Sequence, residues 1–200
     1  SHHQDHQAQA AALALRRTLL LVTGGPGTGK TTTIARLLLL RIAQAHASNT
    51  PAPRIALAAP TGRAAERMAE SLRAAVARAI ANGIDPALAD ALPTGASTLH
   101  RLLGVIPDSP QFRHTADNPL PFDLIVVDEA HETSFKQEDG VHYHARDVAV
   151  MRGHFEGLPV VLASATPALE SLAMVEAGRY RHIVLPARYG GATLPDLAAI

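Results

Sequence analysis

Hydrophobic residues along the chain fall into five short continuous runs, separated by longer stretches with helical periodicity. The runs cover residues 18–23, 54–59, 123–127, 159–163 and 181–185. Continuous apolar runs of this length are typical of parallel strands that are buried on both faces. The periodic stretches, which we expect to be helices, cover residues 31–47, 63–82, 145–153 and 168–177. This alternation predicts an α/β domain of three layers, with helices on both faces of a mainly parallel sheet.

The remaining stretches refine this outline. The stretch 63–82 repeats apolar residues such as Met68, Leu72 and Val76 at helical spacing, so we expect this stripe to face the core. Two segments, 83–97 and 104–121, are predicted loops, and the second is rich in proline, aspartate and asparagine.

A glycine-rich segment between the first run and the first helix carries the most specific chemistry. Its residues are Gly24, Gly25, Pro26, Gly27, Thr28, Gly29, Lys30 and Thr31. This is the G-x-x-x-x-G-K-[ST] pattern of a phosphate-binding loop, in its required place between strand and helix. Lys30 is predicted to reach the β and γ phosphates of ATP, Thr31 to bind Mg²⁺, and Thr32 to join the nucleotide contacts. The alternative is a simple glycine-rich turn.

Two carboxylates follow the strand 123–127 directly, as Asp128 and Glu129. At the carboxyl edge of a parallel sheet they would lie beside the phosphate loop. Asp128 is predicted to hold Mg²⁺, directly or through water, and Glu129 to orient and deprotonate the attacking water. A strand-end pair alone is weak, but together with the complete phosphate loop it indicates nucleoside-triphosphate hydrolysis.

Net charge, cysteine content and the length of the apolar runs limit the kinds of partner and compartment that we expect. The chain has 200 residues and a formal net charge of zero, so any nucleic-acid binding must be local. It contains no cysteine, which excludes disulfides and thiolate zinc sites. No apolar run approaches the roughly 20 residues of a membrane span, and the polar start lacks the order of a signal peptide. We therefore expect a cytoplasmic protein with no membrane partner.

Two short motifs resemble those of a large helicase group. Asp128-Glu129-Ala130-His131 matches its Asp-Glu-x-His box, and Ser164-Ala165-Thr166 matches its Ser-Ala-Thr motif. This resemblance implies that His131, with Ser164 and Thr166, couples the γ-phosphate site to DNA binding. An additional interpretation is that Thr166 caps the helix that begins after Pro167.

Residues 7–130 resemble RecD, the α subunit of exonuclease V. The segments that carry the resemblance are 22–33, 57–65 and 97–104, with further matches at 112–114 and 118–121. The resemblance implies that Gln7 reads adenine. It also implies DNA contacts from Thr61, Gly62, Arg63, Thr98 and His100; without the family, these residues would form an ordinary loop and helix start.

Residues 123–200 resemble PriA, the primosomal replication-restart helicase. The matching segments are 131–140, 143–149, 164–171 and 178–181, although position 130 is alanine where that family usually has glutamate. The resemblance implies an aromatic-rich loop that contacts DNA through Phe135, Lys136, Tyr143 and Arg146. Zinc at His131, His142 and His144 is a weaker alternative, since the zinc ligands of PriA are cysteines.

The two resemblances suggest a natural or engineered fusion of two helicase first lobes, joined within 123–131. The expected divisions are an N-terminal segment 1–17, a RecA-like P-loop domain 18–186 and a linker 187–200, in which Arg188 leads towards a second lobe. In the usual strand order, the strand 159–163 would pack between the strands 18–23 and 123–127. A strand from the part that resembles PriA would thus pack beside a strand from the part that resembles RecD.

The sequence as a whole predicts the first motor lobe of an ATP-dependent DNA helicase of repair, recombination or replication restart. ATP and Mg²⁺ are the predicted cofactors. Single-stranded or forked DNA and recombination or primosome proteins are the predicted partners. An isolated lobe is expected to hydrolyse ATP slowly and not to unwind DNA. The alternatives are a nucleotide-binding module without turnover and, less consistent with the motifs, a small-metabolite kinase.

Overall fold

The computed structural model describes residues 19–128 and 144–185. Its strands are β1 (Leu19–Thr23), β2 (Ile55–Ala59), β3 (Ser97–Thr98), β4 (Leu124–Val127), β5 (Val160–Ser164) and β6 (Arg181–Val184). Its helices are α2 (Lys30–Ala47), α3 (Gly62–Ala81), the 3-10 helix η1 (Pro86–Ala91), α4 (Leu99–Leu103), α5 (Ala145–Glu156) and α6 (Leu169–Glu176). The strands and the longer helices lie within a few residues of the ranges predicted from the sequence.

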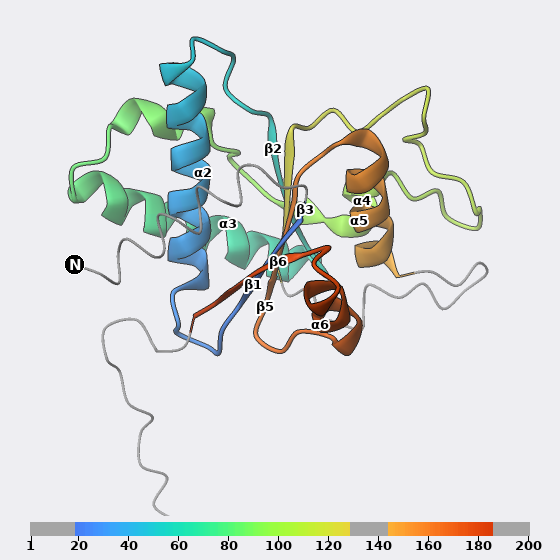
Figure 1. Ribbon diagram of the computed structural model, residues 1–200. Coiled ribbons are helices and arrows are strands. Elements are labelled where there is room, and N and C mark those ends of the chain that lie inside the picture. Colours follow the sequence, from blue (N-terminus) through green and yellow to red (C-terminus); the bar gives the residue numbers. More distant parts are fainter. Residues whose placement is uncertain (1–18, 129–143, 186–200) are drawn as a thin grey trace, which may run out of the picture.

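The strands form one sheet in the order β3-β2-β4-β5-β1-β6, and every paired neighbour is parallel. Helices α2 and α3 lie on one side of the sheet, and α4, α5 and α6 lie on the other (Figure 1). The predicted α/β class with three layers is confirmed, and this is the RecA-like P-loop arrangement.

Two hydrophobic cores fill the spaces on either side of the sheet. Alternate residues of β1 pack into the two cores. Leu20 and Val22 pack on the side of α2 and α3, whereas Leu19 and Leu21 pack on the side of α4 and α5. The stripe along α3 that includes Met68, Leu72 and Val76 is buried, as its spacing predicts.

Strand β5 lies between β1 and β4, as expected from the usual strand order. Its residues are all buried, and Leu162 is 0% exposed. Both cores combine residues from before and after the segment 123–131. The two parts of the chain that resemble different families therefore share one continuous interior.

Three short elements, β3, η1 and α4, were not predicted from the sequence, and all lie in or beside predicted loops. The loop that follows α4 is tied to α5 by two side chains. Arg152 donates to the carbonyl of His114 at 3.1 Å, and a carboxylate oxygen of Glu156 accepts from the N–H of Leu120 at 3.2 Å. Arg152 and Glu156 also form an ion pair at 2.6 Å. These polar contacts hold the long loop together with two isolated antiparallel bridges, Val105–Phe112 and Thr115–Asn118.

The interpretation of Thr166 as a helix cap is wrong. Helix α6 begins at Leu169, and its N-cap residue is Ala168, with φ −65° and ψ 148° and no side-chain hydrogen bond at the cap. Pro167 and Ala168 lie between Thr166 and Leu169, the first residue of the helix. The helix consequently starts beyond the reach of this hydroxyl.

No helix in the described parts of the chain is both long and apolar enough to cross a membrane.

Candidate functional site

The predicted nucleotide residues converge at one edge of the sheet. Because all the strands are parallel, β1, β4 and β5 end on the same edge. The phosphate loop follows β1, Asp128 follows β4, and Ser164 is the last residue of β5. Thr23 pairs with Ser164 across β1 and β5, and the N–H of Gly24 donates to the carbonyl of Ser164 at 3.4 Å. The loop and the end of β5 are thus in direct contact.

Glycine is required at several positions of the loop. Gly27 and Gly29 have φ values of 76° and 86°, in the left-handed region that disfavours side chains. At Gly24 the restriction is steric, because a Cβ atom would lie 2.4 Å from Oγ1 of Thr28 and 3.0 Å from the carbonyl oxygen of Leu185. The glycines of the motif therefore allow this tight backbone path.

The ammonium group of Lys30 is held inside the loop. Its Nζ donates to the carbonyl of Gly24 at 2.5 Å and to that of Gly25 at 3.1 Å. Burial lowers the pKa of Lys30, and the negative charge of Asp128 acts in the opposite direction. Lys30 and Asp128 therefore interact across the site, and a triphosphate can replace the loop carbonyls as the partner of this ammonium.

The start of α2 is suited to an anion. The first N–H groups of a helix lack intrahelical partners, and side chains often satisfy them. In α3 and α4, threonine hydroxyls at the N-cap accept these hydrogen bonds, but the N-cap of α2 is Gly29, which has no side chain to do so. Phosphate oxygens bind well at such a helix start.

The donor set at this edge fits Mg²⁺. The hydroxyl of Thr31 and the carboxylate of Asp128 are hard oxygen ligands, and both residues are half-buried. Within residues 19–128 and 144–185, no group of three or more histidines or carboxylates could form a complete metal site. The pair of oxygen ligands from Thr31 and Asp128 suits Mg²⁺, which is commonly held by one or two protein oxygens together with substrate phosphates.

A second group of predicted residues lies at the ends of β2 and β3. These strands are neighbours, with Ala59 opposite Thr98. The hydroxyl of Thr61 accepts from the N–H of Ala64 at 3.2 Å, and that of Thr98 accepts from the N–H of Arg101 at 3.3 Å. Each hydroxyl therefore caps a helix while its own O–H group can donate to an external phosphate.

The neighbours of these threonines differ in exposure. Gly62 and Arg63 are exposed in the first turn of α3, and a Cβ at Gly62 would meet no atom within 4 Å. His100 is half-buried, and burial lowers its pKa, which favours the neutral imidazole. Thr61, Gly62, Arg63, Thr98 and His100 thus belong to two adjacent strand ends and the helices that follow them.

The residues predicted to couple the two sites and to form the aromatic-rich loop differ in exposure and in contacts. Ser164 is 1% exposed, whereas Thr166 is exposed. Arg146 does not suit the predicted contact with DNA, because the residue is only 7% exposed and its guanidinium pairs with Asp147 at 2.8 Å. Six other candidates lie outside the described residues: Gln7, Glu129, His131, Phe135, Lys136 and Tyr143.

The proposed zinc ligands are likewise only partly described. His131 and His142 lie outside the described residues. The ring Nδ1 of His144 accepts a hydrogen bond from the N–H of Arg146 at 3.3 Å, so this histidine caps α5. This contact gives His144 a local structural role.

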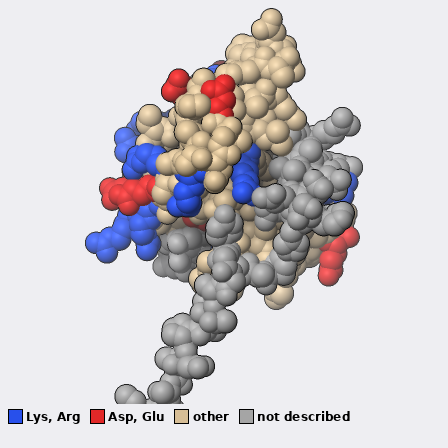
Figure 2. Space-filling model, turned by 90° about the vertical axis from the view of Figure 1, so that its left-hand side faces the viewer, with Lys and Arg blue, Asp and Glu red and all other residues tan. Residues whose placement is uncertain are grey.

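Charge on the face formed by α2 and α3 is mixed. Arginine and acidic side chains both lie over this face (Figure 2). Along the exposed side of α3, Glu66 and Glu70 lie among four arginines, Arg63, Arg67, Arg73 and Arg78. The described residues of this face therefore carry charges of both signs.

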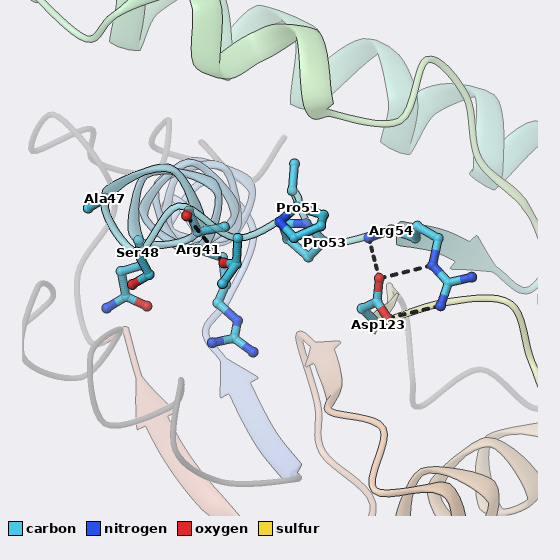
Figure 3. Close-up of a pocket in the computed structure, with 11 residues that line it drawn as sticks. Arg41, Ala47, Ser48, Pro51, Pro53, Arg54 and Asp123 are labelled. Carbon is cyan, nitrogen blue, oxygen red and sulfur yellow. Dashed lines mark hydrogen bonds and ion pairs between the residues drawn. The ribbon is translucent and has the colours of Figure 1, made fainter.

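A hollow of about 820 Å³ lies away from the phosphate loop, at the opposite edge of the sheet. Arg54 and Asp123, which precede β2 and β4, line it and join the starts of these strands (Figure 3). The carboxylate of Asp123 accepts from Nε of Arg54 at 3.0 Å and from its backbone N–H at 2.8 Å. Hydrogen bonding to Arg54 lowers the pKa of Asp123. Position and contacts indicate a structural role for this pair.

A family model described as an AAA domain matches residues 7–141. The chain is 52% identical over 125 residues to the RecBCD enzyme subunit RecD of Mycobacterium tuberculosis (strain CDC 1551 / Oshkosh), a match that covers 62% of this chain and 21% of the relative. It is 33% identical over 186 residues to the replication restart protein PriA of Rickettsia conorii, covering 90% of this chain and 26% of the relative. Both resemblances predicted from the sequence are confirmed.

The PriA likeness is longer than expected. An alignment of 186 residues extends well beyond the range 123–200, so the two likenesses overlap in the part that resembles RecD. The fusion at 123–131 stays a hypothesis.

The chain spans about a fifth to a quarter of the length of these relatives. Among solved structures, it is similar to Bacteroides Pif1 bound to ssDNA, with 16% identity, a TM-score of 0.44 and coverage of 92% of this chain and 41% of that chain.

Proposed function

The chain belongs to the AAA-domain family whose model matches residues 7–141, and from this premise we propose that it is the ATP-binding motor lobe of a DNA helicase. It is a segment of the RecD and PriA kind. The proposed activity is hydrolysis of ATP with Mg²⁺, coupled to the binding of single-stranded DNA. The proposed setting is DNA repair, recombination or replication restart.

The observation that carries this proposal is the meeting of the phosphate loop with Asp128 at one edge of the sheet. Lys30 lies inside the loop and interacts with Asp128. A half-buried cation that interacts with a carboxylate, next to an uncapped helix start, suits a magnesium-bound triphosphate. This combination favours nucleotide hydrolysis over a glycine-rich turn.

Each residue of the site has a proposed task. Lys30 leaves the loop carbonyls and binds the β and γ phosphates, where it offsets charge on the transferred group. Backbone N–H groups of the loop and of the first turn of α2 hold the remaining phosphate oxygens. Thr31 and Asp128 hold Mg²⁺, which neutralises charge that develops on the phosphates. Glu129 orients and deprotonates the attacking water.

The nucleic-acid surface is proposed to lie at the ends of β2 and β3. The hydroxyls of Thr61 and Thr98 can each donate to a phosphate oxygen while they cap their helices. Arg63 adds an exposed positive charge in the first turn of α3. These contacts address the backbone rather than the bases, which suits a motor that moves along DNA of any sequence.

The names of the relatives suggest partner proteins. RecD is named as a subunit of the RecBCD enzyme, and PriA is named as a replication restart protein. We propose that this lobe works with proteins of recombination or of replication restart. We further propose that Ser164 and Thr166, at the end of β5, link the nucleotide site to DNA.

The proposal predicts ATP hydrolysis that single-stranded DNA stimulates. Phosphate release should rise severalfold when a saturating oligonucleotide is added, since DNA contacts and hydrolytic residues share one sheet edge. Glu129→Gln should remove both the basal and the stimulated rate while MgATP still binds, because the amide cannot accept the proton of water. Binding without turnover in the parent chain would favour the alternative of a nucleotide-binding module.

Arg63 provides a separate test of the nucleic-acid surface. Arg63→Ala should weaken binding of single-stranded DNA by about 5- to 20-fold and lower the slope of log K against log salt by about 0.7, the value for one lost phosphate contact on a single strand. The control is Arg78→Ala, which removes an exposed arginine from the last turn of the same helix. An equal loss of DNA affinity in the two variants would contradict a DNA contact confined to the first turn of α3. Fluorescence anisotropy with a labelled oligonucleotide measures both quantities.

A further inference from the structure

One contact next to the phosphate loop has no role in the function proposed above. Thr23, the last residue of β1, shares a hydrogen bond of 2.7 Å with Nε2 of His182 on β6. Thr23 is 5% exposed, and His182 is half-buried. The two residues are far apart in sequence, so this bond forms only when β6 pairs with β1.

The register explains why the two side chains meet. In the parallel pair β1 and β6, His182 lies opposite Leu21, and Val184 lies opposite Thr23. Side chains two residues apart on a strand point to the same face, so His182 and Thr23 both lie on the face of Leu21. The contact is therefore a diagonal bond across one face of the pair.

Backbone contacts from the end of β6 reinforce this bond. The N–H of Leu185 donates to the carbonyl of Thr23 at 2.8 Å. A Cβ atom on Gly24 would lie 3.0 Å from both Cβ and the carbonyl oxygen of Leu185, so the first glycine of the loop packs closely on this residue. The loop thus leaves β1 between Ser164 of β5 on one side and Leu185 on the other.

We propose that His182 is a positioning residue for the phosphate loop. It holds the hydroxyl of Thr23, fixes the end of β1 against β6 and thereby sets where Gly24 and the following loop stand to receive the triphosphate. This inference rests on the proposed ATP binding. It assigns β6, which carries none of the motif residues, a direct part in forming the nucleotide site.

The environment of His182 is consistent with this role. Burial lowers the pKa of its imidazole, which favours the neutral ring at neutral pH. A neutral imidazole can either accept from the threonine hydroxyl or donate to it, because the hydroxyl rotates to suit. The hydrogen bond therefore needs no change of protonation when nucleotide binds.

A double-mutant cycle on nucleotide affinity tests the proposal. The dissociation constant of a fluorescent ATP analogue with Mg²⁺ is measured for the parent, His182→Leu, Thr23→Val and the double variant. Each single variant should weaken binding by about 2- to 10-fold, the range expected if the loop keeps its binding position only while this hydrogen bond is formed. The double variant should bind the analogue about as weakly as each single variant, and the two losses of affinity should not multiply, because both changes break the same bond.

Two further variants separate positioning from general stability. His182→Gln keeps a hydrogen-bonding group near the position of Nε2 and should recover most of the affinity. His46→Leu makes the same kind of change at an exposed histidine in the last turn of α2 and should bind like the parent. All titrations are run below the unfolding transition of every variant, as measured by circular dichroism.

The outcomes separate this inference from the proposed function. If the parent binds the analogue, Lys30→Ala does not, and His182→Leu binds as tightly as the parent, the positioning role is wrong while ATP binding stands. Multiplicative losses in the double variant would also overturn it, since the two residues would then act independently. Failure of the parent itself to bind would overturn both proposals.

Discussion

Lys30→Ala is expected to lower the rate of ATP hydrolysis by about 100-fold or more. The ammonium of Lys30 lies inside the phosphate loop, where burial lowers its pKa and Asp128 faces it. A preorganised donor that stabilises charge in the transition state contributes about 10²–10³ in rate, and a charged donor in a partly buried site belongs at the upper end. Phosphate release at saturating MgATP measures the loss.

Arg41→Ala is the matched control for this prediction. Arg41 lies on the same helix, α2, but beside the hollow at the opposite edge of the sheet, so its removal takes one cation from the helix without touching the loop. We expect its rate within about twofold of the parent, as for a surface change away from the site. A Lys30→Ala variant that retained a third of the parental rate would show that the loop does not hold the reacting phosphates.

Leu162→Ala is expected to lower the free energy of unfolding by about 2–5 kcal/mol, the range for a large-to-small change in a packed core. Leu162 is 0% exposed in β5, which lies between β1 and β4. Its removal leaves a cavity among strands that come from both sides of 123–131. Typical domains are stable by about 5–15 kcal/mol, so the variant loses a large share of its stability. Urea unfolding followed by circular dichroism measures the change.

The same substitution at Leu169 provides the comparison. Leu169 is 82% exposed in the first turn of α6, so Leu169→Ala should change the unfolding free energy by no more than about 0.5 kcal/mol. A similarly small effect at Leu162 would mean that β5 does not occupy the centre of the sheet. It would also remove the support for a continuous interior across the two likenesses.

The sequence predicted the sheet well because its strands are continuous apolar runs, which only a doubly covered parallel sheet buries. It also predicted the place of the glycine-rich loop between β1 and α2, since glycines with positive φ followed by a helix start have a specific sequence pattern. It missed β3 and α4 because two-residue strands and five-residue helices carry too few positions for a period to emerge.

The contacts that sequence reasoning could not supply are those between distant elements. The bond between Thr23 and His182 depends on which strand pairs with β1, and no local pattern encodes that choice. Arg146 is a different case, because a basic residue in an aromatic-rich segment suggests DNA contact, whereas Arg146 is 7% exposed and pairs with its chain neighbour Asp147. The cap of α6 was misplaced by two residues, because a proline just before a helical stretch suggests the first helical position, which is here Leu169.

The strand order has a consequence for how the protein is made. The two neighbours of β1 are β5 and β6, which come after the other described strands of the sheet in chain order and are synthesised later. A ribosome adds residues slowly enough that β1 waits on the order of ten seconds for them. During this interval the newly made chain has the complete glycine motif but lacks both flanks that shape it. The long sequence separation between β1 and its partners β5 and β6 also slows folding, because the entropy cost of closing the intervening chain comes before the strands gain contacts. ATP should therefore bind only to chains that have completed the sheet, and by mass action it then draws late-folding molecules into the finished state.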